Sequence, residues 1–166
     1  MLKWFIKRPM TMAAIVAVVF LLWLAFRPEL LFVNKHVDDA GLTFPARAAA
    51  EPSALESGSF VAAAHDTAGD VTIYKLDNSS KVLRLTNFHT SNGPDVHVYL
   101  TSAEKVNSNG DVTAGKYIDL GSLKGNIGNQ NYAIPQSANL NDFHSVSIWC
   151  ARFQVNFGAA QLGHGG

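Results

Sequence analysis

The chain has 166 residues, with 13 Lys or Arg balanced by 13 Asp or Glu, and 48% of its residues are hydrophobic. This length provides for one domain with a single core and some additional segments. From Ser57 onward seven basic and eight acidic residues are interspersed, so the basic stripe that phosphate neutralisation requires is missing and no nucleic-acid partner is expected.

Residues 10–26 (MTMAAIVAVVFLLWLAF) carry no charge and predict one transmembrane helix, at the short end of the length a bilayer requires. Basic residues and no acidic residue precede this run, so the positive-inside bias places residues 1–9 in the cytoplasm and the rest of the chain outside the cytoplasmic membrane. Membrane lipid is therefore an expected partner. A cleaved signal peptide is the alternative; it is disfavoured because Phe26, Arg27 and Pro28 stand where a small-residue cleavage site would follow.

Residues 27–56 are interpreted as a juxtamembrane segment and linker. Near its beginning this region has the apolar cluster LLFV (30–33), and we expect this part to lie close to the membrane or to dock on the surface of the domain. Residues 45–59 are rich in Ala, Pro, Ser and Gly without periodicity, which is typical of a linker. We place the globular domain at residues 57–162 and a flexible tail at residues 163–166.

Within the domain, apolar residues alternate with period two, the pattern of half-buried strands. In DVHVYL (95–100) the apolar residues share one face, while His97 and Tyr99 point to the other. No periodic helix of ten residues follows the apolar run, so the sequence predicts an all-β fold, an antiparallel β-sandwich. The apolar residues of 146–150 and 153–157 have opposite parity, and we expect a bulge or crossing at Ala151 to reconcile them.

Four stretches of the domain carry a family likeness: SGSFVAAAHDTAGDVTIY (57–74), LRLTNFHTSNGPDVHVYL (83–100), IDLGSLKGNIGNQNYAIP (118–135) and FHSVSIWCARFQVNFGAAQL (143–162). Together they resemble the DM-thirteen electron-transfer domain family, in a bacterial membrane-anchored form. The resemblance implies a β-sandwich related to the cytochrome-like haem domains of cell-surface redox proteins, and a role in electron transfer with a redox protein as partner. It also implies that Cys150 acts as a bare thiol or as the ligand of a prosthetic group.

Cys150 is the only cysteine, so an intrachain disulfide is excluded. Its parity with residues 146 and 148 predicts an inward-facing side chain, and a buried cysteine behaves as a small hydrophobe. A redox role requires that a partner can reach the Cys150 thiol and that the pKa of this thiol is lowered, and the sequence establishes neither. Both interpretations of Cys150 therefore stay open.

Haem is the one cofactor that stays open. No c-type attachment motif is present, and all methionines lie within or before residues 10–26, which excludes His/Met ligation in the domain. A haem held by the Cys150 thiolate or by a histidine remains possible; His144, next to the cysteine-bearing strand, is the candidate second ligand. No metal site is predicted, because the first histidine after Cys150 is His164, too distant for a blue-copper loop.

The alternative to an electron-transfer module is a structural or adhesion module in which Cys150 only fills the core. A hydrolase ranks third, because no Ser/His/Asp grouping and no pair of flanking carboxylates can be argued. His97 is expected to be a solvated strand residue. We therefore assign no enzymatic activity.

Overall fold

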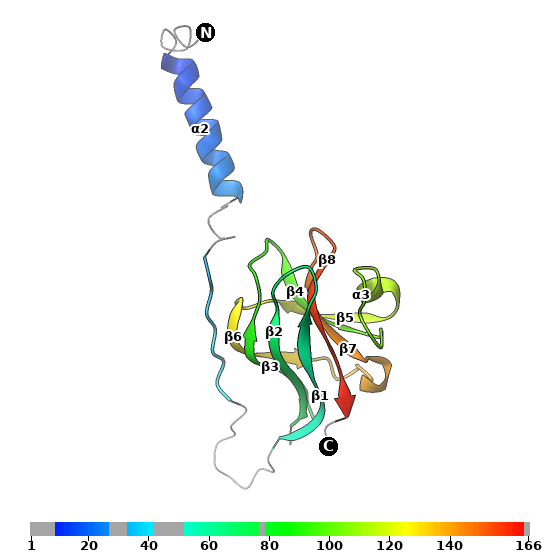
Figure 1. Cartoon of the computed structure of the whole chain (residues 1–166). Coiled ribbons are helices and arrows are strands. Elements are labelled where there is room, and N and C mark those ends of the chain that lie inside the picture. Colours follow the sequence, from blue (N-terminus) through cyan, green and yellow to red (C-terminus); the bar gives the residue numbers. More distant parts are fainter. Residues whose placement is uncertain (1–8, 27–32, 42–51, 77–78, 165–166) are drawn as a thin grey trace. The chain divides into compact units, whose positions relative to one another are not determined.

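The computed structural model describes residues 9–26, 33–41, 52–76 and 79–164 (Figure 1). The chain divides into two compact units, residues 1–33 and residues 34–166, and each is described by itself.

The first unit contains helix α2, Pro9–Phe26. The side chains of residues 10–24 are exposed, and most of them are apolar. Within the part of the chain that the structure describes, no helix combines the length and the apolarity needed to cross a membrane. The transmembrane span predicted for residues 10–26 is therefore not supported. The 18 residues of α2 rise about 27 Å, less than the about 30 Å of a bilayer's hydrocarbon core.

The second unit is an all-β antiparallel sheet that curls nearly into a barrel, which confirms the predicted fold class (Figure 1). Its strands are β1 (Ser53–Ala62), β2 (Ala68–Lys75), β3 (Lys81–His89), β4 (Val96–Thr101), β5 (Tyr117–Ser122), β6 (Ile127–Ile134), β7 (Ser145–Cys150), β8 (Val155–Gln161) and β9 (Gly163–His164). The strand order is β5-β4-β7-β8-β1-β2-β3-β6, and β9 pairs with β1.

Strand β1 joins the two halves of the sheet. Residues 53–59 pair with β2, whereas residues 60–62 pair with β8 on the other side of the core. A strand that changes partner in this way makes a corner, so the two halves face each other across one apolar interior. The alternation predicted from sequence is confirmed there, because Val71, Ile73 and Leu85 have no exposed surface.

Strand β7 is buried on both faces. Its inner face, with Val146, Ile148 and Cys150, belongs to the main core. The outer face is covered by the excursion between β4 and β5, which holds the one-turn helix α3 (Asp111–Ala114). There, Val112 packs with Tyr99 and Trp149 in a second, smaller cluster.

The connection from β7 to β8 corrects a prediction. A four-residue turn, residues 151–154, separates the strands, and Cys150 pairs directly with Val155. Gln154 adopts a φ of 54°, which closes the turn. The expected bulge or crossing at Ala151 is therefore wrong, since the change of parity marks the reversal of the chain. Phe153, expected to point inward, lies on the turn and is 65% exposed.

Residues 34–41, from the predicted juxtamembrane segment, run along the edge of β6. His36 forms a parallel bridge with Ile127, and the Val37 amide donates to the Ile127 carbonyl at 2.9 Å. This segment is therefore part of the second unit.

Candidate functional site

Cys150 ends strand β7 and lies in the main apolar core. Its partners on the neighbouring strands are Val96 and Val155, and its own exposure is 0%. A thiol enclosed in this way cannot be touched by a second sulfur or by an external oxidant in this conformation. Any electron must instead reach the sulfur through packed protein.

His144 lies at the opposite end of the same strand, just before Ser145. Six residues of extended chain separate it from Cys150, a distance of about 20 Å. His144 lines a hollow of about 360 Å³ together with Glu56, Phe143 and Leu162. The structure therefore does not bring together the two candidate ligands, Cys150 and His144.

A haem ligated by Cys150 does not fit this arrangement. An iron must sit within bonding distance of the sulfur, and the macrocycle needs an apolar slot beside it. Cys150 is closed in by the core, and His144 is too distant to serve as a second axial ligand.

A site that was not predicted surrounds His97 on the outer face of β4. Its Nδ1 lies 2.9 Å from Asp119 Oδ2, and its Nε2 lies 3.1 Å from Asp95 Oδ1. The register between β4 and β5 shifts between His97 and Tyr99, next to Gly121, which adopts a φ of 113°. This bulge turns the Asp119 carboxylate toward the imidazole.

The two carboxylates favour the charged form of His97. Burial opposes that charge, but the hydrogen bonds with Asp119 and Asp95 outweigh it and raise the pKa of His97 above its usual 6.5. With both ring nitrogens engaged, the imidazolium donates a hydrogen bond on each side. The carboxylates bracket the ring from opposite sides, so they do not converge on a space for a cation. Among the described residues, no group of three or more His, Cys, Asp or Glu side chains is arranged to hold a metal ion.

Stability should therefore depend on the protonation of His97. Because its folded pKa is raised, the contribution is fully present below pH 6.5 and is lost as pH rises through the folded value. We expect His97→Gln to cost about 1 kcal/mol at pH 5.5 and less at pH 8.5, measured by urea unfolding. In NMR titrations, Asp119→Asn should lower the His97 pKa, whereas Asp142→Asn, at the separate Lys116 pair, should not. Identical His97 titrations in all three proteins would contradict this account.

Aromatic rings extend from His97 across the same face. The His97 and Tyr99 rings meet edge to face at 6.2 Å, and the Tyr99 ring stacks on Tyr117 at 5.3 Å. Tyr99 also lies 6.3 Å from Trp149, the residue that precedes Cys150. Tyr117 is 48% exposed, whereas Tyr99 and Trp149 are buried. The rings therefore form a continuous series from the surface to the backbone of the cysteine-bearing strand.

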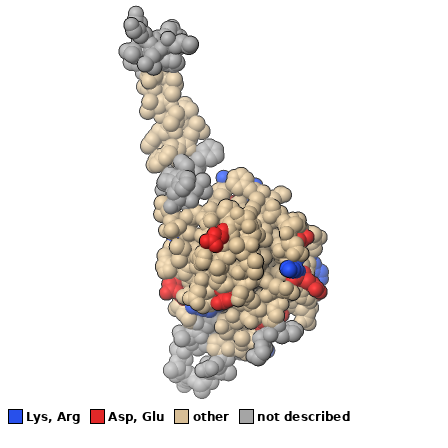
Figure 2. Space-filling view, in the orientation of Figure 1, with Lys and Arg blue, Asp and Glu red and all other residues tan. Residues whose placement is uncertain are grey.

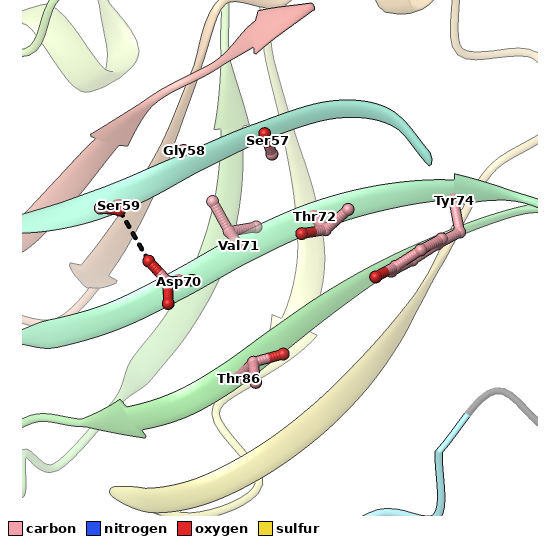
Figure 3. A pocket seen from close by; sticks show the side chains of 8 residues that line it. All are labelled: Ser57, Gly58, Ser59, Asp70, Val71, Thr72, Tyr74 and Thr86. Carbon is pink, nitrogen blue, oxygen red and sulfur yellow. Dashed lines mark hydrogen bonds between the residues drawn. The ribbon is translucent and has the colours of Figure 1, made fainter. Parts of the chain in front are cut away.

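A polar hollow of about 410 Å³ lies elsewhere, over β1, β2 and β3 (Figure 3). Ser59 donates to Asp70 there at 2.6 Å, and Thr72, Tyr74 and Thr86 contribute further hydroxyl groups. None of the described residues that line the hollow is a histidine or a lysine, so among them the Ser59–Asp70 pair has no such base to activate a nucleophile.

Charges of both signs are scattered over the face of the domain shown in Figure 2. Asp95 and Asp119, at 43% and 39% exposure, place two carboxylates against one imidazolium beside the aromatic series. When His97 is charged, this group therefore carries one net negative charge beside the aromatic series.

Sequence reasoning missed the His97 site for an identifiable reason. Asp95 lies in the turn directly before β4, two residues before His97, a spacing that lets both side chains lie on the same side of the strand, and this signal was available. Asp119 is remote in sequence, and only the pairing of β4 with β5 brings it to His97.

Comparison with known families identifies a match over most of the β domain. Residues 59–162 match the model of the family described as Electron transfer DM13. No significant match was found among curated proteins or among solved structures. The match covers the four stretches quoted above almost entirely, so the predicted family resemblance is confirmed.

Proposed function

The chain belongs to the electron transfer DM13 family, and on this basis we propose that its β domain is an electron-transfer module in which Cys150 is the redox residue. The observation that carries the proposal is the family match over residues 59–162, which includes strands β2 to β8 and the end of β1 that carries Phe60. A redox protein is the proposed partner.

The arrangement of the aromatic rings supports a route for the electron. Electron tunnelling falls steeply with distance, so closely spaced rings favour transfer over an equal thickness of aliphatic packing. Tyr117, at the surface, would face the partner, and Tyr99 and Trp149 would connect it to the strand of Cys150. The acidic pair beside this route favours a partner with a basic docking face.

The bare thiol is the form of Cys150 that the packing accommodates. A role as the ligand of a prosthetic group would require the β7–β8 end of the core to open. Loss of one electron from the thiol leaves a sulfur radical and frees the S–H proton, which must reach the solvent at the β7–β8 end, where Cys150 ends β7. Because a lone thiyl radical is a strong oxidant, the partner must be a still stronger one-electron acceptor, and one electron should leave each chain.

The test is electron exchange with a cationic one-electron acceptor. The full chain in mild detergent is oxidised by photogenerated tris(bipyridine)ruthenium(III), a strong cationic one-electron acceptor, and the tyrosyl radical that forms should decay as Cys150 supplies an electron, followed by absorbance. Cys150→Ala should slow this decay at least about tenfold. Ser102→Ala, a small change remote from Cys150, is the matched control. Equal rates for the wild type and Cys150→Ala would sink the proposal, because no other thiol is present in the chain.

We also propose that the domain stands on the outer side of the cytoplasmic membrane, held by residues 10–26. The support is the exposed apolar surface of α2 and the cluster of Lys3, Lys7 and Arg8 before it. Protease added to intact spheroplasts should digest the domain, and a domain that survives until the cells are lysed would refute this placement.

A second candidate function is a structural or adhesion module without redox activity. The complete burial of Cys150 favours it, since an apolar enclosure is what a purely structural cysteine requires. The oxidation experiment separates the two, because this candidate predicts no dependence of the radical decay on Cys150.

A further inference from the structure

Strand β6 lies at one end of the sheet order, and an open strand edge normally needs cover. Residues 34–41 supply that cover, although they lie outside the stretch that matches the family. The Val37 amide donates to Ile127 at 2.9 Å, and the Asp39 amide donates to Asn129 at 2.8 Å. The segment therefore docks by β-augmentation, through its backbone.

Asparagine side chains of the β6 edge bind the same segment at successive points. Asn126 accepts from the Lys35 amide at 2.7 Å. Asn129 donates to Asp38 Oδ1 at 2.7 Å, and Asn131 donates to the Ala40 carbonyl at 3.1 Å. Side chains that bond to both backbone and carboxylate fix the register of the docked chain.

Asp39 is the central anchor of the segment. Its carboxylate lies 2.6 Å from Lys124 Nζ and accepts from the Asn131 amide at 2.9 Å. Arg84 adds a hydrogen bond to the Ala40 carbonyl at 3.2 Å. These hydrogen bonds, with the nearby charges of Lys124 and Arg84, hold the pKa of Asp39 below its usual value. The groove is thus cationic where the segment is acidic.

Two glycines leave room for the docked backbone. A Cβ on Gly125 would collide with the Lys35 carbonyl oxygen, and one on Gly128 would collide with that of Val37. Gly128 also has a φ of 107°, which other residues rarely adopt. These glycines make no nucleotide-binding fingerprint, and their close contact with residues 35 and 37 gives them a different role.

We propose that the β6 edge is a specific docking groove for an extended segment with a central aspartate, and that its occupant is residues 34–41 of the same chain. Docking sets the reach of the domain from α2. When docked, only residues 27–33 connect the two, a contour of about 24 Å; when released, residues 27–52 span up to about 90 Å. By binding residues 34–41, the groove therefore limits the length of chain that is free between α2 and the domain.

The test uses the full chain with a protease site inserted within residues 42–51. After cleavage in mild detergent, the N-terminal fragment should still co-elute with the domain in size-exclusion chromatography. Asp39→Asn should weaken the binding of the cleaved fragment to the domain about tenfold. Asp142→Asn, which disrupts only the surface pair with Lys116, should leave this binding unchanged. Asp39→Lys combined with Lys124→Asp should recover part of what either change loses.

Three results would overturn the proposal. The cleaved fragment could separate at once, or Asp39→Asn could behave like Asp142→Asn while both proteins remain folded by circular dichroism. Alternatively, two differently tagged, uncleaved copies could co-purify in a manner that depends on Asp39, which would assign the groove to a segment of a second copy.

Discussion

Replacing Gln130 with alanine should lower the free energy of unfolding by about 3 kcal/mol, because Gln130 is a fully buried hub of hydrogen bonds. Its Nε2 donates to the Gly125 carbonyl at 2.7 Å, and its Oε1 accepts from Tyr132 Oη at 2.7 Å and from the Lys124 amide at 3.2 Å. Alanine would remove the partners that Gln130 gives to the Gly125 carbonyl and to the Tyr132 hydroxyl proton, whereas the Lys124 amide would keep its hydrogen bond to Tyr132 Oη at 3.0 Å. Urea unfolding of the wild type and the variant measures the difference.

Tyr132 cannot replace the lost acceptor by ionising. Burial raises its pKa to about 12, so it remains a hydroxyl that must donate somewhere. Gln130→Leu keeps the volume but removes the hydrogen bonds, and it should cost about as much as the alanine variant. Gln136→Ala, at an exposed position, should change stability by less than about 0.5 kcal/mol. A small effect of both Gln130 variants would contradict the role of the hub.

The same change should loosen the docked segment. Gln130 fixes the loop that carries Lys124 and Gly125, and this loop presents Asn126 and Lys124 to residues 34–41. Hydrogen exchange of the Val37 and Asp39 amides should accelerate in Gln130→Ala more than that of Leu85 in the core. Uniform acceleration would instead indicate only a general loss of stability.

The sequence was sufficient where one periodicity decided the structure. The alternation at residues 71–73, 83–85 and 96–100 assigned each side chain to its face, because a period of two leaves no other arrangement with a buried core. Prediction from the sequence failed where both faces of a strand are covered. Ser145 and Ser147 are buried under the α3 excursion, and no pattern in the sequence around them indicates that their face of the strand is covered.

Contacts between remote segments account for the other misses. The turn at residues 151–154 has no Gly, Asn or Pro, so its chemistry gave no turn signal, and Gln154 takes an unusual positive φ. Residues 34–41 have few apolar side chains, and their affinity for β6 comes from the backbone and from Asn129 and Asn131. Asp119 reaches His97 only through strand pairing. A single sequence carries none of this information.

Cys150 should resist alkylation until the domain opens. Its sulfur has no exposed surface, and if exposure requires unfolding at a cost of about 5 kcal/mol, labelling should be slower than in the unfolded chain by about 10³- to 10⁴-fold. The measurement is the rate of reaction with a maleimide, followed by mass spectrometry, with and without urea. The matched control is Phe153→Cys in a Cys150→Ala background, since residue 153 is 65% exposed on the turn before β8 and should label at once.

The outcome bears directly on the form in which Cys150 works. A protected thiol that still supports Cys150-dependent decay of the tyrosyl radical requires the electron to travel through the protein, and the series Trp149, Tyr99 and Tyr117 is the route that the packing offers. Rapid labelling of native Cys150 would instead reveal an opening of the β7–β8 end near Val155. In that case, direct contact with a partner, or ligation of a prosthetic group, becomes the physically simpler mechanism.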